Sequence, residues 1–288
     1  MNNYQILETV NHTPKAGDLY FLQLKDHPVG SEPWGPYCCL LLRRFEDGDM
    51  WEVALTEKLS AFSNPSYRKP NKNWKVIQTG TEKRVVLFSH DSCVSSKRFQ
   101  YYLGTISDKE LRGVYDSLIN LRLSMIKDSW KKQAKVIPED KHTPKAGDLY
   151  WMQMKDNPKG HEEQKPRPCL LLHHFGNQDM WEVVVAKRIT ENTNSRFLHP
   201  DKNWKRLFSR KEKRVALFNQ RDCISKERFG TYEGRISNSD LRSIHYGLKE
   251  LYEVMLEEIT EKEAEMSAQK PIYNFIPPRF SKGYIPTR

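Results

Sequence analysis

The sequence lacks the apolar segments that membrane insertion and secretion require. It has no run of about eighteen apolar residues, and no short hydrophobic segment of the signal-peptide kind follows Met1. A transmembrane helix needs about twenty such residues, and a secretory signal needs a shorter apolar stretch near its start. We therefore expect a cytoplasmic protein that has no membrane partner.

Cysteine is also infrequent, and its spacing indicates no zinc site. The five cysteines contain no C-x-x-C pair: Cys38, Cys39, Cys93, Cys169 and Cys223. An odd number without metal-ligand spacing is typical of buried thiols in a reducing compartment. The sequence therefore predicts neither a metal nor a cofactor.

The composition favours a soluble protein with an anionic partner. Apolar residues make up 38% of the 288 residues and charged residues 29%, which is typical of globular domains. This length favours two domains over one. The net charge of +10 indicates an anionic partner, and nucleic acid is the commonest one.

The sequence contains two copies of one pattern. "HTPKAGDLYFLQLKDHPVGSE" begins at His12, and "HTPKAGDLYWMQMKDNPKGHE" begins 130 residues later, at His142. The same offset pairs Trp51 with Trp181, Trp74 with Trp204 and Cys93 with Cys223, and no gap is needed before about Ile126. A solenoid would need more and shorter repeats. We predict a first domain over 1–126, a charged linker over 127–141, a second domain over 142–265 and a tail over 266–288.

Each copy has short apolar runs followed by a helical pattern. The predicted strands are 18–24, 38–45, 50–56 and 83–89, with counterparts at 148–154, 169–175, 180–186 and 213–219. Ser107 and Glu110 form a helix-start signal before an apolar stripe, and Ser237 and Asp240 occupy the same places in the second copy. The fold class is therefore mainly β with α, and a small, strongly bent sheet closed by a terminal helix fits this order.

The tail "QKPIYNFIPPRFSKGYIPTR" has a different composition, rich in proline, aromatics and cations. Such a segment cannot form a regular helix or strand. Two alternatives stay open, a flexible end and a peptide that docks on a partner or on the protein itself.

The second copy resembles the MazF/PemK (Kid-like) family of type II toxins. "AGDLYWMQMKDNPKGHEEQKPRPCLLL" is similar to the family's opening strand and its loop of the form G-[SH]-E-Q-x-G-x-R-P. "VALFNQRDCISKERFGTYEGRISNSDLRSIHYGL" is similar to the closing pattern, and the first copy shows the same order. The resemblance implies an SH3-like barrel with flanking helices in each copy. It also implies a homodimer that cleaves single-stranded RNA without a metal, leaves a cyclic phosphate and is inhibited by an antitoxin peptide. Two copies in one chain would then form an intrachain pseudo-dimer.

The loop of the second copy carries the candidate catalytic residues His161, Glu162 and Arg167. Metal-free RNA cleavage needs a base, an acid and a cation for the charged phosphorane. Arg167 matches the family's catalytic arginine, and His161 stands where some members have a catalytic histidine. Glu162 matches the loop glutamate, for which the sequence leaves two roles open, a base or a residue that orients the loop.

The first copy departs from this pattern. Glu32 remains, but Ser31 and Tyr37 replace the histidine and the arginine. A tyrosine cannot neutralise a phosphorane at neutral pH, although it can stack on a base. We expect catalysis to be lost at this loop, with the second copy retaining the arginine.

Other family positions are incomplete in both copies. The strand-end threonine is Thr56 in the first copy, whereas the second has Ala186 followed by Lys187. Ser89 and Asn219 replace the acid of the family's acid-Gln pair. Two possibilities follow: a reduced site around His161 and Arg167, or a fold that now only binds.

Aromatic and basic residues mark candidate nucleic-acid contacts. The motif "KNWK" occurs at Lys72 and again at Lys202. Tryptophans beside lysines provide stacking and phosphate neutralisation, and each stacked base contributes on the order of 1–3 kcal/mol. The alternative is that Trp74 and Trp204 are partly buried loop anchors. The candidate contacts are Glu32, Tyr37, Thr56, Lys69, Lys72, Trp74, Lys187, Lys202 and Trp204.

Three functional hypotheses follow. The first is a single-chain endoribonuclease that acts on single-stranded RNA and has an antitoxin or other protein partner. The second is a catalytically degenerate module that binds nucleic acid or a protein. The third is a scaffold that captures a partner through the tail.

Overall fold

The protein was analysed in a computed structural model, which describes residues 12–46, 49–60, 71–131, 143–176, 179–197, 201–209 and 212–268. We call residues 12–131 the first half and residues 143–268 the second half. Most of the predicted linker and most of the tail lie outside the described residues.

The first half contains one antiparallel sheet and one helix. Its elements are β1 (Asp18–Gln23), β2 (Pro36–Arg44), β3 (Met50–Lys58), β4 (Trp74–Thr79), β5 (Glu82–Ser95), β6 (Phe99–Thr105) and α1 (Asp108–Lys131). The six strands lie in the order β4-β5-β3-β2-β1-β6.

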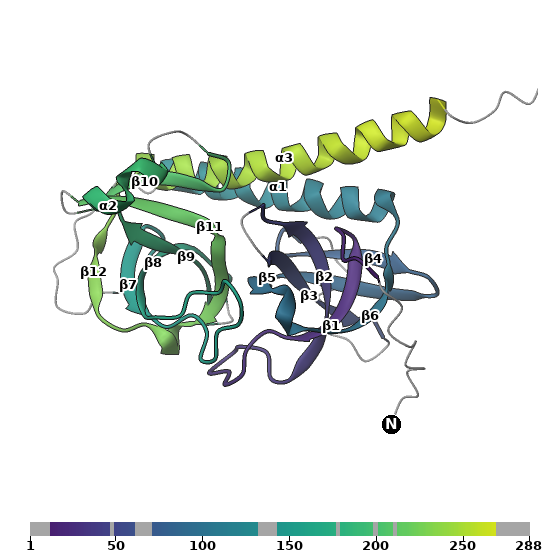
Figure 1. The fold of residues 1–288 in the computed structure, drawn as a ribbon, viewed down its shortest axis with the longest axis horizontal. Helices are drawn as coiled ribbons and strands as arrows, with labels where there is room; N and C mark the ends of the chain where they lie inside the picture. The colour runs from purple at the N-terminus through teal and green to yellow at the C-terminus, as the bar shows by residue number, and fades with distance from the viewer. Residues whose placement is uncertain are drawn as a thin grey trace, which may run out of the picture.

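The second half repeats this arrangement. Its elements are β7 (Asp148–Met152), β8 (Arg167–His174), β9 (Met180–Arg188), the short α2 (Glu191–Asn194), β10 (Trp204–Ser209), β11 (Glu212–Ser225), β12 (Tyr232–Arg235) and α3 (Asn238–Ala268). The strands lie in the order β10-β11-β9-β8-β7-β12, which is the order of the first sheet. Each sheet curves around its own core (Figure 1).

The two six-stranded sheets and their helices confirm the predicted fold class, mainly β with α. All eight predicted strands are present. The sequence reading missed β4, β6 and their counterparts β10 and β12. These are edge strands with mixed burial: in β4 only Ile77 is buried, so they lack the continuous apolar run of an interior strand.

The helices confirm the predicted start and apolar stripe. The Ser107 hydroxyl accepts a hydrogen bond from the Glu110 backbone N–H at 3.2 Å, as an N-cap does. The stripe is buried at Leu111, Val114, Tyr115, Leu118 and Leu121. The helix α1 continues to Lys131, five residues into the predicted linker, and α3 continues to Ala268. The two helices lie side by side along one face of the molecule (Figure 1).

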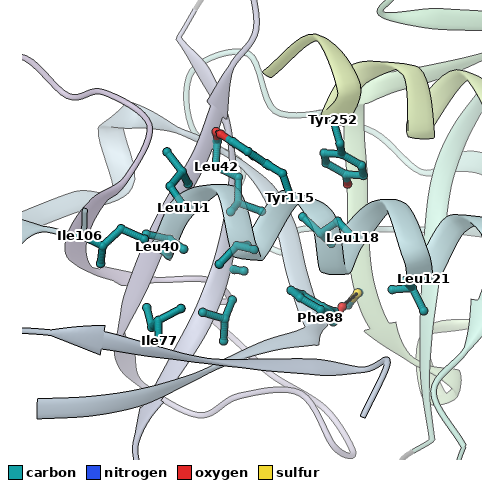
Figure 2. Packing of buried hydrophobic residues seen from close by; sticks show 14 of the residues in the cluster. Leu40, Leu42, Ile77, Phe88, Ile106, Leu111, Tyr115, Leu118, Leu121 and Tyr252 are labelled. Atoms are coloured by element: carbon teal, nitrogen blue, oxygen red, sulfur yellow. Dashed lines mark hydrogen bonds between the residues drawn. The ribbon is translucent and has the colours of Figure 1, made fainter. Parts of the chain in front are cut away.

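This pairing of helices makes the cores of the two halves continuous. The α1 stripe packs on Leu40, Ile77 and Phe88, and Tyr252 of α3 lies beside it (Figure 2). The same apolar cluster contains Phe175 and Cys223 of the second half. Neither core is complete without residues from the other half.

Two further sequence expectations can be compared with the described residues. No helix among them is long and apolar enough to span a membrane. The prediction of buried thiols is confirmed, since all five cysteines are free and buried.

Candidate active site

Each half sends one loop onto the other half. The loop between β1 and β2 contacts the end of β11, and the loop between β7 and β8 contacts the end of β5. The two loop glutamates make these contacts. Glu162 accepts hydrogen bonds from the Ser95 backbone N–H at 3.0 Å and from Arg98 at 2.7 and 2.9 Å.

The matching glutamate of the first half makes the same contacts in the opposite direction. Glu32 accepts from the Ser225 backbone N–H at 3.1 Å and from Arg228 at 2.6 and 2.8 Å. Both glutamates are almost fully buried, at 2% exposed for Glu32 and 3% for Glu162. Their carboxylates, together with Asp26 and Asp156, raise the pKa of Arg98 and Arg228 against the opposing effect of burial. Of the two roles left open for Glu162, this geometry favours orientation of the loop.

Glycine allows these loops to approach closely. Gly160 has φ +52°, and a Cβ there would lie 2.2 Å from Asp49 Oδ2 and 2.4 Å from Ser95 Oγ. Gly30 has φ +53°, and a Cβ there would lie 2.3 Å from Ser225 Oγ. A side chain at either position would push the loop away from the other half.

The docked loop brings His161 against an acid of the first half. His161 Nδ1 lies 2.7 Å from Asp49 Oδ1, and the His161 backbone N–H donates to the same oxygen at 3.2 Å. Burial raises the pKa of Asp49, but the hydrogen bonds from Ser95 and His161 outweigh it and lower that pKa. Asp49 is therefore a carboxylate at neutral pH, and the exposed imidazole has a fixed partner on one nitrogen.

Arg167 begins β8, in the same loop region. Its Nε lies 3.2 Å from Glu163 Oε1, and the side chain is half-buried. Its Nε makes no hydrogen bond to the described residues despite this contact, so the guanidinium keeps donors for an anion. Glu162 faces away toward Arg98, so Glu163 rather than Glu162 is the acid beside Arg167.

A β-bulge completes the loop's support. The pairing of β11 with β9 shifts between Leu217 and Arg221, which moves Gln220 out of register. Gln220 donates to the His161 carbonyl oxygen at 2.8 Å and accepts from the Glu163 backbone N–H at 3.1 Å. The amide thus fixes the backbone on both sides of Glu162.

The first half has different chemistry at the equivalent places. Ser31 corresponds to His161, Tyr37 to Arg167 and His90 to Gln220. His90 lies 2.9 Å from Ser89 Oγ, and burial lowers its pKa to about 4, so the ring is neutral at pH 7. No cation stands where Arg167 stands in the second half.

Charged groups fill the boundary between the halves. Fully buried Arg221 pairs with Glu52 at 2.5 Å, with Asp91, and with Glu182 at 3.0 Å. Arg122 of α1 reaches the same Glu182 at 2.6 Å. Burial, helped by Glu52 and Glu182, raises the pKa of Asp91 to about 8 despite Arg221. The cluster therefore holds three carboxyl groups around two guanidinium groups, and Asp91 pairs with Arg221 across the boundary.

Two lysines extend this boundary. Lys25 pairs with Asp222, and Lys155 pairs with the same Asp222 at 3.0 Å and with Ser92 Oγ at 2.8 Å. Burial raises the pKa of Asp222, but the two lysines outweigh it and lower that pKa.

The predicted nucleic-acid contacts divide into three groups. Three of these residues have side chains that are buried in the structure. Glu32 is bound to Arg228, Thr56 is 2% exposed with its hydroxyl bonded to the Cys38 carbonyl at 2.9 Å, and Trp204 is 8% exposed against Phe197. Buried groups cannot meet a base or a phosphate, so Trp204 is a loop anchor.

The other predicted contacts are accessible or not described. Lys72 and Lys202 are exposed, and Lys202 pairs with Glu46 at 2.7 Å. Tyr37, Trp74 and Lys187 are half-buried. Lys69 lies outside the described residues.

Sequence reasoning missed Asp49, Glu163 and Gln220 as parts of this site. Asp49 lies 112 positions from His161 along the chain, and no local pattern connects them. Gln220 could have been found from the sequence, since it is the glutamine of the family's acid-Gln pair. In this chain Asn219 replaces the acid of that pair.

Comparison with known families supports the resemblance for the second half. Residues 145–252 match the family described as PemK-like, MazF-like toxin of type II toxin-antitoxin system. The match spans the second sheet and the first part of α3, and it includes His161, Arg167 and Gln220. No curated protein matches the chain. The second half is thus similar to toxins of this family.

Proposed function

We propose that the protein is a metal-independent endoribonuclease that cleaves single-stranded RNA at one composite site. The two halves would be SH3-like domains that arose by tandem duplication and form an intrachain pseudo-dimer. The main support is that the loop of the second half holds His161 and Arg167, while the first half supplies Asp49, which binds the histidine at 2.7 Å.

The contacts suggest a role for each group. When Nδ1–H donates to Asp49, the Nε2 of His161 is free to take the proton of a ribose 2′-hydroxyl. The 2′-oxygen then attacks phosphorus, and the 5′-oxygen leaves with a proton from water, which yields a 2′,3′-cyclic phosphate and a 5′-hydroxyl. Arg167 neutralises the charge that develops on the phosphorane oxygens.

The first half acts as a support in this proposal. Arg98 and Ser95 hold Glu162, and Asp49 holds His161, so the active loop depends on groups from the other half. An antitoxin-like peptide lying over the same loop would inhibit the enzyme by covering Arg167.

The proposal is tested by incubating the purified chain with a mixed single-stranded RNA pool in EDTA. We expect fragments that end in cyclic phosphate from the wild type and a loss of at least a hundredfold in Arg167→Ala. Tyr37→Ala, the equivalent change in the first half, is the matched comparison: it removes no cation, so its loss of activity should be far smaller than that of Arg167→Ala. Equal activity in Arg167→Ala and the wild type would remove the proposed site.

The alternative is a degenerate module that binds RNA without cutting it. It is favoured by Ala186 and Asn219, which replace two polar groups of the family's site. Salt-sensitive RNA binding without products, weakened by reversing the charges of Lys72 and Lys75, would support it.

A further inference from the structure

A cavity separate from the loop of His161 and Arg167 lies at the boundary between the halves. It has a volume of about 350 Å³, which is within the range of small-molecule sites. Its walls come from the segment before β1, the end of β2, the start of β3, the turn before β10 and one face of α3. No residue of the loop 153–166 lines it.

The lining combines positive charge with an apolar wall. Lys15, Arg43, Arg44 and Lys202 face two carboxylates, and one of these, Glu46, already pairs with Lys202 at 2.7 Å. Apolar side chains of α3, including Leu251 and Met255, also line it. An anion with an apolar body matches both surfaces.

Arg43 is a buried cation of this lining with few hydrogen-bond acceptors. It is 6% exposed, and its only hydrogen bond to a described residue is to the neutral amide of Asn203, at a long 3.3 Å. Its guanidinium lies 4.2 Å from the Phe45 ring centroid, and its buried Nε has no hydrogen-bond partner among the described residues. Its cross-strand neighbour Glu52 is near enough for Arg43 to help lower the pKa of that carboxyl, but no carboxylate of the described residues pairs with Arg43 within 4.0 Å. A buried guanidinium with unused donors is unfavourable until an anion accepts from them.

The second half provides an internal comparison. His173 and His174 replace Arg43 and Arg44, and His173 packs edge-on against Phe175 at 4.8 Å. Burial lowers the pKa of His173 to about 4 and also lowers that of His174, so both rings are neutral at pH 7. Only the first half keeps permanent charges at these two positions.

We propose that this cavity binds a small phosphomonoester with an apolar or aromatic body. Arg43, Arg44 and Lys15 hold the phosphate, and the apolar face of α3 contacts the body. A phosphate dianion is preferred to a carboxylate because it has more acceptor oxygens for two arginine forks. The inference is independent of the proposed ribonuclease activity, since the lining residues and that loop do not overlap.

Calorimetric titration of the full chain with phenyl phosphate, 5′-AMP and inorganic phosphate tests this proposal. We expect saturable one-to-one binding of phenyl phosphate, 5′-AMP or both, at least tenfold tighter than inorganic phosphate. The two organic probes separate a simple aromatic phosphate from a nucleotide. Lys15→Ala/Arg44→Ala changes two exposed side chains and should raise the Kd at least tenfold without unfolding the protein.

Two control variants identify where the probe binds. Lys145→Ala/His174→Ala alters the equivalent place in the second half, and Arg167→Ala alters the proposed ribonuclease site; both should keep the wild-type Kd. Arg43→His, which copies the second half, should weaken binding as the double variant does. No saturable binding of either organic probe, equal affinity for inorganic phosphate, or loss of binding in Arg167→Ala alone would overturn the proposal.

Discussion

The two halves share a strand order but differ most where they meet. Position 91 of the first half is aspartate, and its counterpart in the second half is Arg221. These two residues pair with each other across the boundary. In a dimer of identical subunits the same position would place two like charges together. A complementary pair can arise there only when the two sides have different sequences.

The candidate sites differ in the same way. The second half has His161 and Arg167, whereas the first half has Ser31 and Tyr37 but supplies Asp49 to the histidine. The docking contacts made by Glu32 and Glu162 are nearly identical. The contacts that join the halves therefore follow a two-fold pattern, while the groups available for chemistry are concentrated on one side.

The largest effect is expected from breaking the complementary pair at the boundary. Arg221→Asp would leave buried Glu52, Asp91 and Glu182 with one fewer cation, so unfolding free energy should fall by about 3–5 kcal/mol. Urea unfolding monitored by circular dichroism measures this. The charge swap Asp91→Arg/Arg221→Asp should recover most of the loss, and a swap as unstable as the single variant would contradict the pairing.

Substitutions of Glu32 and Glu162, which bind arginines of the opposite half, should affect stability equally but activity differently. Glu162→Gln and Glu32→Gln each remove a carboxylate that accepts from a buried arginine, and each should cost about 1.5–3 kcal/mol in unfolding free energy. Only Glu162→Gln should also reduce RNA cleavage, because only that loop carries His161 and Arg167. Equal loss of cleavage in both variants would argue against a single active side.

The next effect concerns the acid that orients His161. Asp49→Asn should lower kcat for RNA cleavage roughly tenfold to a hundredfold with little change in KM, because the imidazole loses its fixed tautomer. Nitrogen-15 NMR of the imidazole should show Nδ1–H in the wild type and a mixture of tautomers in the variant. Asp179→Asn, the equivalent change in the second half, is the control. An unchanged tautomer in Asp49→Asn would disprove the orienting role.

The smallest effect is a pH dependence of stability that differs between the halves. Burial, with a contribution from Arg122, lowers the pKa of His245 to about 3, whereas the equivalent residue in the first half is Tyr115. The unfolded chain takes up this proton near pH 6.5 and the folded chain does not. The part of the unfolding free energy that depends on neutral His245 is therefore lost as the pH falls from about 6.5 toward 3.

His245→Tyr should reduce the slope of unfolding free energy against pH by up to about 1.4 kcal/mol per pH unit in this range. Tyr115→His, the reciprocal change, should steepen it. Unfolding free energies at pH 4, 5, 6 and 7 measure both. The raised pKa of Asp91 acts in the opposite direction, lowering stability as the pH rises toward 8, so the difference between variants is the informative quantity. Parallel profiles for the wild type and His245→Tyr would contradict the assignment.

Much of the fold could be predicted from local patterns. The offset between His12 and His142 indicated two similar units, and the apolar runs located eight of the twelve strands. The edge strands β4, β6, β10 and β12 were not predicted because one face of an edge strand needs few apolar residues. The end of α1 was not predicted because its last turn is largely exposed, with Lys127, Asp128 and Trp130 on the surface, so the apolar stripe stops before the helix does.

The sequence by itself determined the two-fold repeat, the strand and helix order, the buried thiols and the loop that carries His161 and Arg167. These follow from periodicity and from residue types at short spacing. The contacts of Glu162 with Arg98 and of Asp49 with His161, and the burial of Trp204, became visible only in the folded chain. Each of these depends on which surfaces meet when two curved sheets pack together. Contacts between distant segments form through burial and charge pairing, and no local pattern encodes them.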